Sequence, residues 1–175
     1  MAHNKAVNYS RLTSAVQWSD GTNGVFSSID LSAYVDPLHS LAFKIVRAQI
    51  TIATDASPYG LMNSSSANNP SIGMQIATGA QTEVLKPSDG KVLYHKYGLY
   101  VNDADGAPYT WQWDTWHVDD LWPGGYIAVV DNLTASADSE ADFSGNFRMC
   151  YSITGYQTKV SANQLASLLV AQTQS

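Results

Sequence analysis

Residues 109–126, YTWQWDTWHVDDLWPGGY, contain four of the five tryptophans of this chain. On a β-strand, Trp111 and Trp113 would share one face, whereas Trp116 and Val118 would share the other. A Trp-Pro-Gly-Gly sequence then ends the run, because proline lacks a backbone donor and glycine tolerates positive φ. A buried aromatic side chain removes about 150–250 Å² of surface from water. The stretch therefore predicts a β core in which at least one of its first three tryptophans is buried.

Apolar and polar side chains alternate on both sides of this stretch, as they do in strands. Residues 41–54, LAFKIVRAQITIAT, form the longest candidate strand. Its apolar pattern changes phase at Ile45-Val46, which predicts a bulge because strand side chains alternate with a period of two. Long bulged strands that bend between two sheets are typical of sandwiches and jelly rolls. Further strands are predicted at residues 15–18, 25–31, 72–76, 93–101, 126–130 and 147–153.

Polar segments between the strands predict loops, and the C-terminus predicts a helix. Residues 55–70 and 134–142 are rich in small polar side chains and are expected to be loops. Ser161 and Gln164 match a capping box that precedes apolar residues at helical spacing. A helix this short is unstable alone in water, so its apolar stripe must dock, and we expect part of it to dock on a neighbouring subunit. The predicted interface residues are Leu165, Leu168 and Leu169.

The length of 175 residues suits one domain. We expect an N-terminal arm at residues 1–15, a β-sandwich at 16–160 and a C-terminal tail at 161–175. The single cysteine, Cys150, excludes an intramolecular disulfide and is interpreted as a small strand residue. The N-terminus lacks an apolar segment of signal-peptide length, which favours synthesis and folding in a cytoplasm.

The charge pattern bears on the partners of the protein. Charged residues make up only 14% of the chain, and the net charge is −6. A weakly charged surface opposes contact between copies less than a highly charged one does. The nine Lys and Arg residues are scattered, which argues against direct nucleic-acid binding through a basic arm and leaves a folded basic surface open.

No catalytic motif stands out, so we expect no enzyme activity and no cofactor. Asp103 and Asp105 are spaced like the start of a calcium loop, but an acidic turn is the preferred interpretation. His117, Asp119 and Asp120 lie in one linear run, whereas acid–base chemistry needs groups that converge from across the fold. They are interpreted as solvated residues. The tryptophans could instead form a platform for sugar rings, with core packing as the preferred interpretation.

The strand pattern resembles the single jelly-roll coat proteins of small icosahedral viruses. The features that carry this resemblance are the bulged strand FKIVRAQITI, the aromatic late strands and the final FRMCYSITGYQTKV. They span most of residues 40–160. The resemblance implies an all-β fold, a single jelly-roll β-sandwich with a short C-terminal helix. It also implies a structural capsid protein that self-assembles into an icosahedral shell.

The chain departs from one common pattern of such proteins. Coat proteins that package single-stranded genomes directly usually carry an Arg-rich arm, and this chain has none. The resemblance is therefore nearest to tailless viruses with an internal membrane, of the sphaerolipovirus type. It implies other copies of the chain as partners, leaves a second coat protein and the internal membrane open, and places the protein in the virion. A secreted carbohydrate-binding β-sandwich remains the alternative function.

Overall fold

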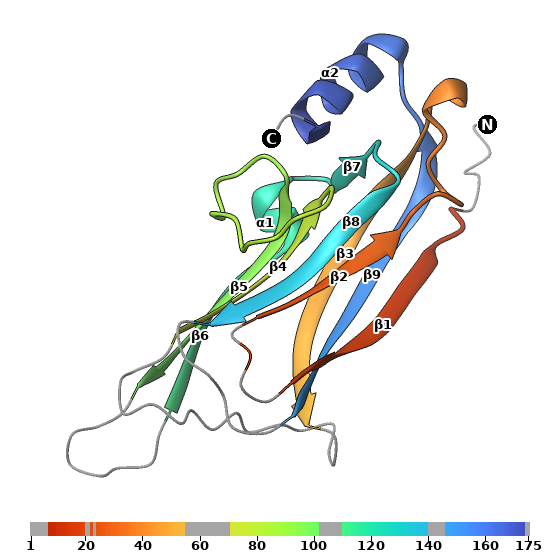
Figure 1. The fold of residues 1–175 in the computed structure, drawn as a ribbon. Coiled ribbons are helices and arrows are strands. Elements are labelled where there is room, and N and C mark those ends of the chain that lie inside the picture. Colours follow the sequence, from red (N-terminus) through yellow and green to blue (C-terminus); the bar gives the residue numbers. More distant parts are fainter. Residues whose placement is uncertain are drawn as a thin grey trace.

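Two antiparallel sheets face each other around an apolar core in the computed structural model, which describes residues 7–19, 22, 24–54, 71–101, 110–139 and 146–173 (Figure 1). Sheet A has the strand order β1-β9-β3-β7, and sheet B has the order β2-β8-β4-β5-β6. The predicted all-β sandwich with a short C-terminal helix is therefore confirmed.

The bounds of the elements are as follows. Sheet A consists of β1 (Ser10–Trp18), β3 (Leu41–Thr54), β7 (Tyr126–Ala128) and β9 (Phe147–Lys159). Sheet B consists of β2 (Gly24–Asp30), β4 (Ser71–Thr78), β5 (Val92–Val101), β6 (Thr110–Trp116) and β8 (Asn132–Ser139). The helical elements are the 3₁₀ turn η1 (Pro37–His39), α1 (Val118–Leu121) and α2 (Ala162–Thr173).

Strand β3 contains the predicted bulge. Its pairing with β9 shifts register between Ile45 and Arg47. Phe43 and Ile45 before the shift and Ala48 and Ile50 after it are all buried in the core. The extra residue therefore turns both phases of the apolar pattern toward the same core, which a regular strand could not do.

Strand β8 corrects the predicted loop at residues 134–142 over residues 134–139, while residues 140–142 lie outside the described part of the chain. It lies in the interior of sheet B, paired with β2 on one side and β4 on the other. Small and acidic residues have low strand propensity, but two neighbouring strands supply backbone partners for this segment. Ala135 and Ala137 face the core and are fully buried. Tertiary pairing has thus overridden local propensity.

Two further boundaries differ from the sequence prediction. Strand β1 begins at Ser10, so residues 10–15 of the expected arm belong to sheet A and pair with β9. Val118 starts α1 instead of continuing the strand that contains Trp116. Loop 55–70, the Asp103–Asp105 turn and residues 1–6 lie outside the described part of the chain.

Neither Trp113 nor Trp116 is fully buried, so the prediction that at least one of the first three tryptophans is buried now depends on Trp111. Trp113 is 42% exposed and Trp116 is half-buried, while the side chain of Trp111 lies outside the described residues. The two described side chains lie on opposite faces of β6, as predicted, because Trp113 pairs with Gly98 and Trp116 with His95. Among the tryptophans whose side chains are described, the fully buried one is Trp18, at the end of β1. None of the helices in the described ranges has the length and apolar character needed to span a bilayer.

Candidate functional site

Helix α2 lies across one end of the sandwich, beside β7 (Figure 1). The Ser161 hydroxyl accepts a hydrogen bond from the backbone N–H of Gln164 at 3.3 Å, which provides the predicted N-cap. The three predicted interface residues, Leu165, Leu168 and Leu169, are half-buried on this same chain. They pack against a small cluster separate from the main core, formed by Ala42, Val129 and Val160.

The apolar stripe of α2 therefore contacts its own barrel in the isolated chain. Its contact with a neighbouring subunit stays a prediction. Val170 projects from the same helix and is 52% exposed, so an apolar side chain remains available on its outer side. Undocking α2 would open the small cluster and leave the main core intact, because the two clusters are distinct.

Gln172 fixes the end of this helix to the edge of sheet A. The side chain is only 4% exposed. Its Nε2 donates to the carbonyl of Ile127 at 2.7 Å, and its Oε1 accepts the N–H of Val129 at 3.0 Å. The side-chain amide thus bonds β7 as a further strand would, and covers part of an edge that could otherwise pair with another chain.

We expect replacement of Gln172 by alanine to lower the free energy of unfolding by about 1–3 kcal/mol. The change leaves a buried N–H and a carbonyl without their partner, and such groups carry a full desolvation cost. Chemical denaturation of the purified protein measures the loss. Asn163→Ala, which removes another side-chain amide at an exposed position of the same helix, is the matched control and should change stability little. Equal effects of the two substitutions would contradict this role of Gln172.

A groove of about 580 Å³ runs between the C-terminal half of α2 and the connections at this end of the sandwich. Its charged lining residues are Lys91 and Asp131, and its apolar ones include Val35 and Leu169. The groove is therefore mixed in character, with both charge signs and apolar surface. It is a shape suited to a side chain or short segment of another protein.

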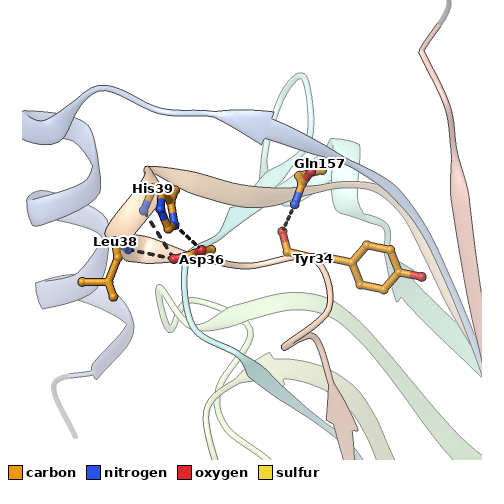
Figure 2. Close-up of polar contacts among 5 residues, drawn as sticks. All are labelled: Tyr34, Asp36, Leu38, His39 and Gln157. Atoms are coloured by element: carbon orange, nitrogen blue, oxygen red, sulfur yellow. Dashed lines mark hydrogen bonds and ion pairs between the residues drawn. The ribbon is translucent and has the colours of Figure 1, made fainter.

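The turn η1 holds an exposed leucine beside this groove (Figure 2). Asp36 Oδ1 accepts the backbone N–H groups of Leu38 and His39 at 3.1 and 3.3 Å. Asp36 Oδ2 lies 2.5 Å from His39 Nδ1, and this contact holds the pKa of the Asp36 carboxyl below its ordinary value. Leu38 itself is 94% exposed. Sequence analysis missed it, although Asp followed by Pro is a signal for a capped turn.

The turn is also attached to sheet A. Gln157 Nε2 on β9 donates to the carbonyl of Tyr34 at 3.1 Å (Figure 2). The Tyr34 ring lies 4.9 Å from the ring of Phe43, centroid to centroid, in the core. The backbone that carries Leu38 is therefore fixed by the contacts of Tyr34 and Asp36. Less conformational entropy is then lost when Leu38 packs against another protein.

One of the acidic residues of α1, Asp120, has a structural role. Asp120 Oδ2 accepts the backbone N–H of His117 at 2.8 Å, which closes the first turn of the helix. Asp119 is exposed nearby. Among the described residues, no three His, Cys, Asp or Glu side chains are grouped so that they could hold a metal ion. Cys150 is half-buried on the outer side of β9.

His95 lies in a second hollow, of about 320 Å³, on the outer side of sheet B. It is only 6% exposed, and its Nδ1 is buried without a hydrogen-bond partner. Burial lowers its pKa below the ordinary value of 6.5, so the ring is neutral near pH 7. Its ring lies 5.6 Å from that of Trp116. His95 thus lines this hollow with a neutral imidazole ring.

We expect the stability of the protein to fall as the pH drops through about 6.5. The unfolded chain takes up a proton on His95 near its ordinary pKa, whereas the folded chain does not until a lower pH. Below pH 6.5 the unfolded state is therefore favoured by proton binding. Thermal melting at pH 7.5, 6.5 and 5.5 measures this, and His95→Gln should show a smaller decrease. An equal decrease in both proteins would contradict the assignment to His95.

Trp113 forms a half-exposed aromatic surface on the inner side of sheet B. Its ring lies so close to Gly98 that a Cβ added there would be 2.5 Å from it. Lys96 Nζ lies over the ring at 4.3 Å from the centroid, and burial lowers the pKa of Lys96. A sugar ring stacking on this indole would have to share it with the ammonium group.

No protein-family model matches this chain, and no curated protein matches it.

Proposed function

We propose that this protein is a structural coat subunit with a single jelly-roll sandwich, which self-assembles into an icosahedral virus shell. Its partners are other copies of itself, with a second coat protein and an internal viral membrane as further candidates, and its location is the virion. It acts by binding surfaces and not by catalysis.

The observation that carries the jelly-roll part of the proposal is the nested pairing of the strands. The first strand pairs with the last, β2 with β8, β3 with β7, and β4 with β5. This is the order produced when one long antiparallel hairpin is rolled into two sheets, which is how two Greek keys form a jelly roll. Strand β6 extends sheet B by one strand at its edge.

The surface supports assembly over other uses of such a sandwich. Jelly rolls also occur in lectin and cupin domains, so the fold alone does not choose a function. Leu38 projects almost fully into solvent from a held turn, next to a groove, and Val170 is exposed on α2. Exposed apolar groups on a weakly charged surface are typical of protein–protein contact sites.

Electron microscopy of the expressed protein tests this function. We expect shells or capsomers, because lasting coat interfaces bury about 2,000 Å² or more and persist on dilution. Sedimentation of the same samples measures the assembled fraction. A protein that stays monomeric under all assembly conditions tried would contradict the proposal.

Leu38→Ser tests the contribution of the exposed turn. Since the side chain is 94% exposed, its loss should change the free energy of unfolding by less than about 0.5 kcal/mol. Assembly, measured by sedimentation, should be weakened strongly. Ser88→Ala, at another exposed position, is the control for a general effect of surface substitution. Normal assembly of the Leu38 variant would exclude the turn from the interface.

A carbohydrate-binding module is the second candidate, favoured by the half-exposed indole of Trp113. The test is binding to a panel of polysaccharides. If the natural protein bound one of them and formed no particles, and if Trp113→Ala abolished this binding, the carbohydrate-binding function would be favoured over a coat subunit.

A further inference from the structure

The strands of sheet A carry basic residues and no acidic one. Sheet B shows the opposite balance, with three aspartates and one lysine in its strands. The protein as a whole has a net charge of −6, so the excess of basic residues in sheet A is opposite in sign to the overall charge. The basic residues in sheet A are Arg11, Lys44, Arg47, Arg148 and Lys159.

Two of these arginines lie in one row on the solvent side of sheet A. Arg11 on β1 and Arg47 on β3 both pair with Thr154 of β9, so the three residues form one row across the sheet. The neighbouring Ile153 is buried in the core, so this row faces outward. Arg11 Nε donates to Ser152 Oγ at 3.0 Å. Both arginines line a shallow hollow of about 190 Å³, with Gln49 completing its wall. This surface is termed the basic face.

The solvent side of sheet B presents carboxylates beside exposed aromatic rings. Asp138, Gly73, Tyr97 and Asp114 form one row across β8, β4, β5 and β6. Tyr97 is 39% exposed, and Asp114 is also exposed. This surface, termed the acidic face, is completed by Phe26, which is 38% exposed, and by Glu83.

Glu83 lies on the connection between β4 and β5, which crosses the outer side of sheet B. The amide of Gln75 holds this connection, donating to the carbonyl of Glu83 at 3.1 Å and accepting the N–H of Leu85 at 2.8 Å. The 320 Å³ hollow that contains His95 opens here, and it is lined by Asp138, Tyr97 and Lys86 as well.

We propose that the basic face of one copy binds the acidic face of a second copy. The inference rests on the proposed coat function and names the surfaces through which subunits meet. A guanidinium is recognised by a carboxylate and by the face of an aromatic ring, and Asp138 and Tyr97 offer these two groups together.

Charge complementarity favours a second copy over a nucleic acid as the occupant. A polyanion would meet one basic face on a molecule whose net charge repels it, whereas a second copy supplies a surface that carries Asp138, Asp114 and Glu83. The two faces belong to different sheets, so the contact is heterologous. Contacts of this kind close into rings, as the capsomers of a shell require, or extend into filaments.

Charge reversal on each face tests the inference. The basic-face variant is Arg11→Glu with Arg47→Glu, and the acidic-face variant is Glu83→Lys with Asp114→Lys; all four positions are exposed, so both should melt like the natural protein. Each variant alone should lose at least about tenfold in self-association by sedimentation. An equimolar mixture should regain it, because each variant then offers the other a surface of opposite charge. Asp119→Lys, an exposed charge reversal on α1, is the control and should have no such effect.

Salt dependence and a competitor complete the experiment. Association should weaken strongly at about 1 M salt, where the screening length falls to about 3 Å. A mixture that associates no better than its components would overturn the inference. The inference would also be overturned if Arg11 and Arg47 were needed for binding a single-stranded oligonucleotide but not for self-association. If the basic-face variant alone formed shells, the proposed contact between the two faces would be wrong and the coat function would stand. If the mixture regained self-association but formed no particles, the contact would stand and the coat function would be wrong.

Discussion

Replacement of Trp18 by alanine is expected to lower the free energy of unfolding by about 3–5 kcal/mol, the usual cost of truncating a buried tryptophan. Trp18 is 1% exposed within the main core. Its indole Nε1 also donates to the carbonyl of Thr22 at 2.9 Å, so the substitution removes a hydrogen bond between β1 and the turn that follows it. For a domain of this size the melting temperature should fall by roughly 6–20 °C.

Calorimetry or chemical denaturation measures this loss. Trp113→Ala is the matched control, because the same atoms are removed from a side chain that is 42% exposed, and its cost should be clearly smaller. Trp18→Phe should fall between the two, since it keeps much of the apolar contact and loses the hydrogen bond. If the Trp113 substitution proved the more damaging, the location of the buried aromatic core would be wrong.

Gly155→Ala is expected to cost about 3 kcal/mol, at the upper end of the range for overpacked cores. Gly155 lies on β9 between Ser10 of β1 and Ile45 of β3. A Cβ there would lie 2.5 Å from the carbonyl oxygen of Lys44 and 2.8 Å from the ring of Phe43. The first of these atoms belongs to the backbone of a paired strand, so it cannot move without disturbing the sheet next to the bulge.

Gly90→Ala is the control for this prediction. Nothing lies within 4 Å of a Cβ at Gly90, and its φ is not positive. Its replacement should be neutral or stabilising by up to about 1 kcal/mol, because alanine restricts the unfolded chain more than glycine does. Equal losses for the two substitutions, measured by chemical denaturation, would contradict the steric explanation.

The mixture of residues in the strands explains why some elements are predictable and others are not. Strand β3 was predicted with its bounds and its bulge, because large apolar residues alternate and the change of phase is visible in the chain itself. Strand β8 was missed, because alanine, serine and aspartate carry almost no periodic signal. Its strand conformation depends on β2 and β4, and these lie far from it in the sequence.

The candidate site shows the same division. The capping pattern at Ser161 and the leucine stripe identify helix α2 from local spacing alone, since capping and amphipathicity act within a few turns. The partner of that stripe is a cluster from three distant segments, and spacing carries no information about it. Gln172 and Leu38 were missed for the same reason: one is buried and the other exposed, and tertiary contacts decide which.

The sequence by itself determined the β class, the main bulge, the C-terminal helix and the scatter of the nine Lys and Arg residues, because each depends on neighbouring residues or on composition. Only the tertiary structure decided the nesting of the strands and the separation of charge. Arg11 and Arg47 are 36 positions apart in the chain, and both pair with Thr154, which lies more than a hundred positions beyond them. Their electrostatic field adds up only when the register of three strands places them in one row, since charge interactions depend on distance in space.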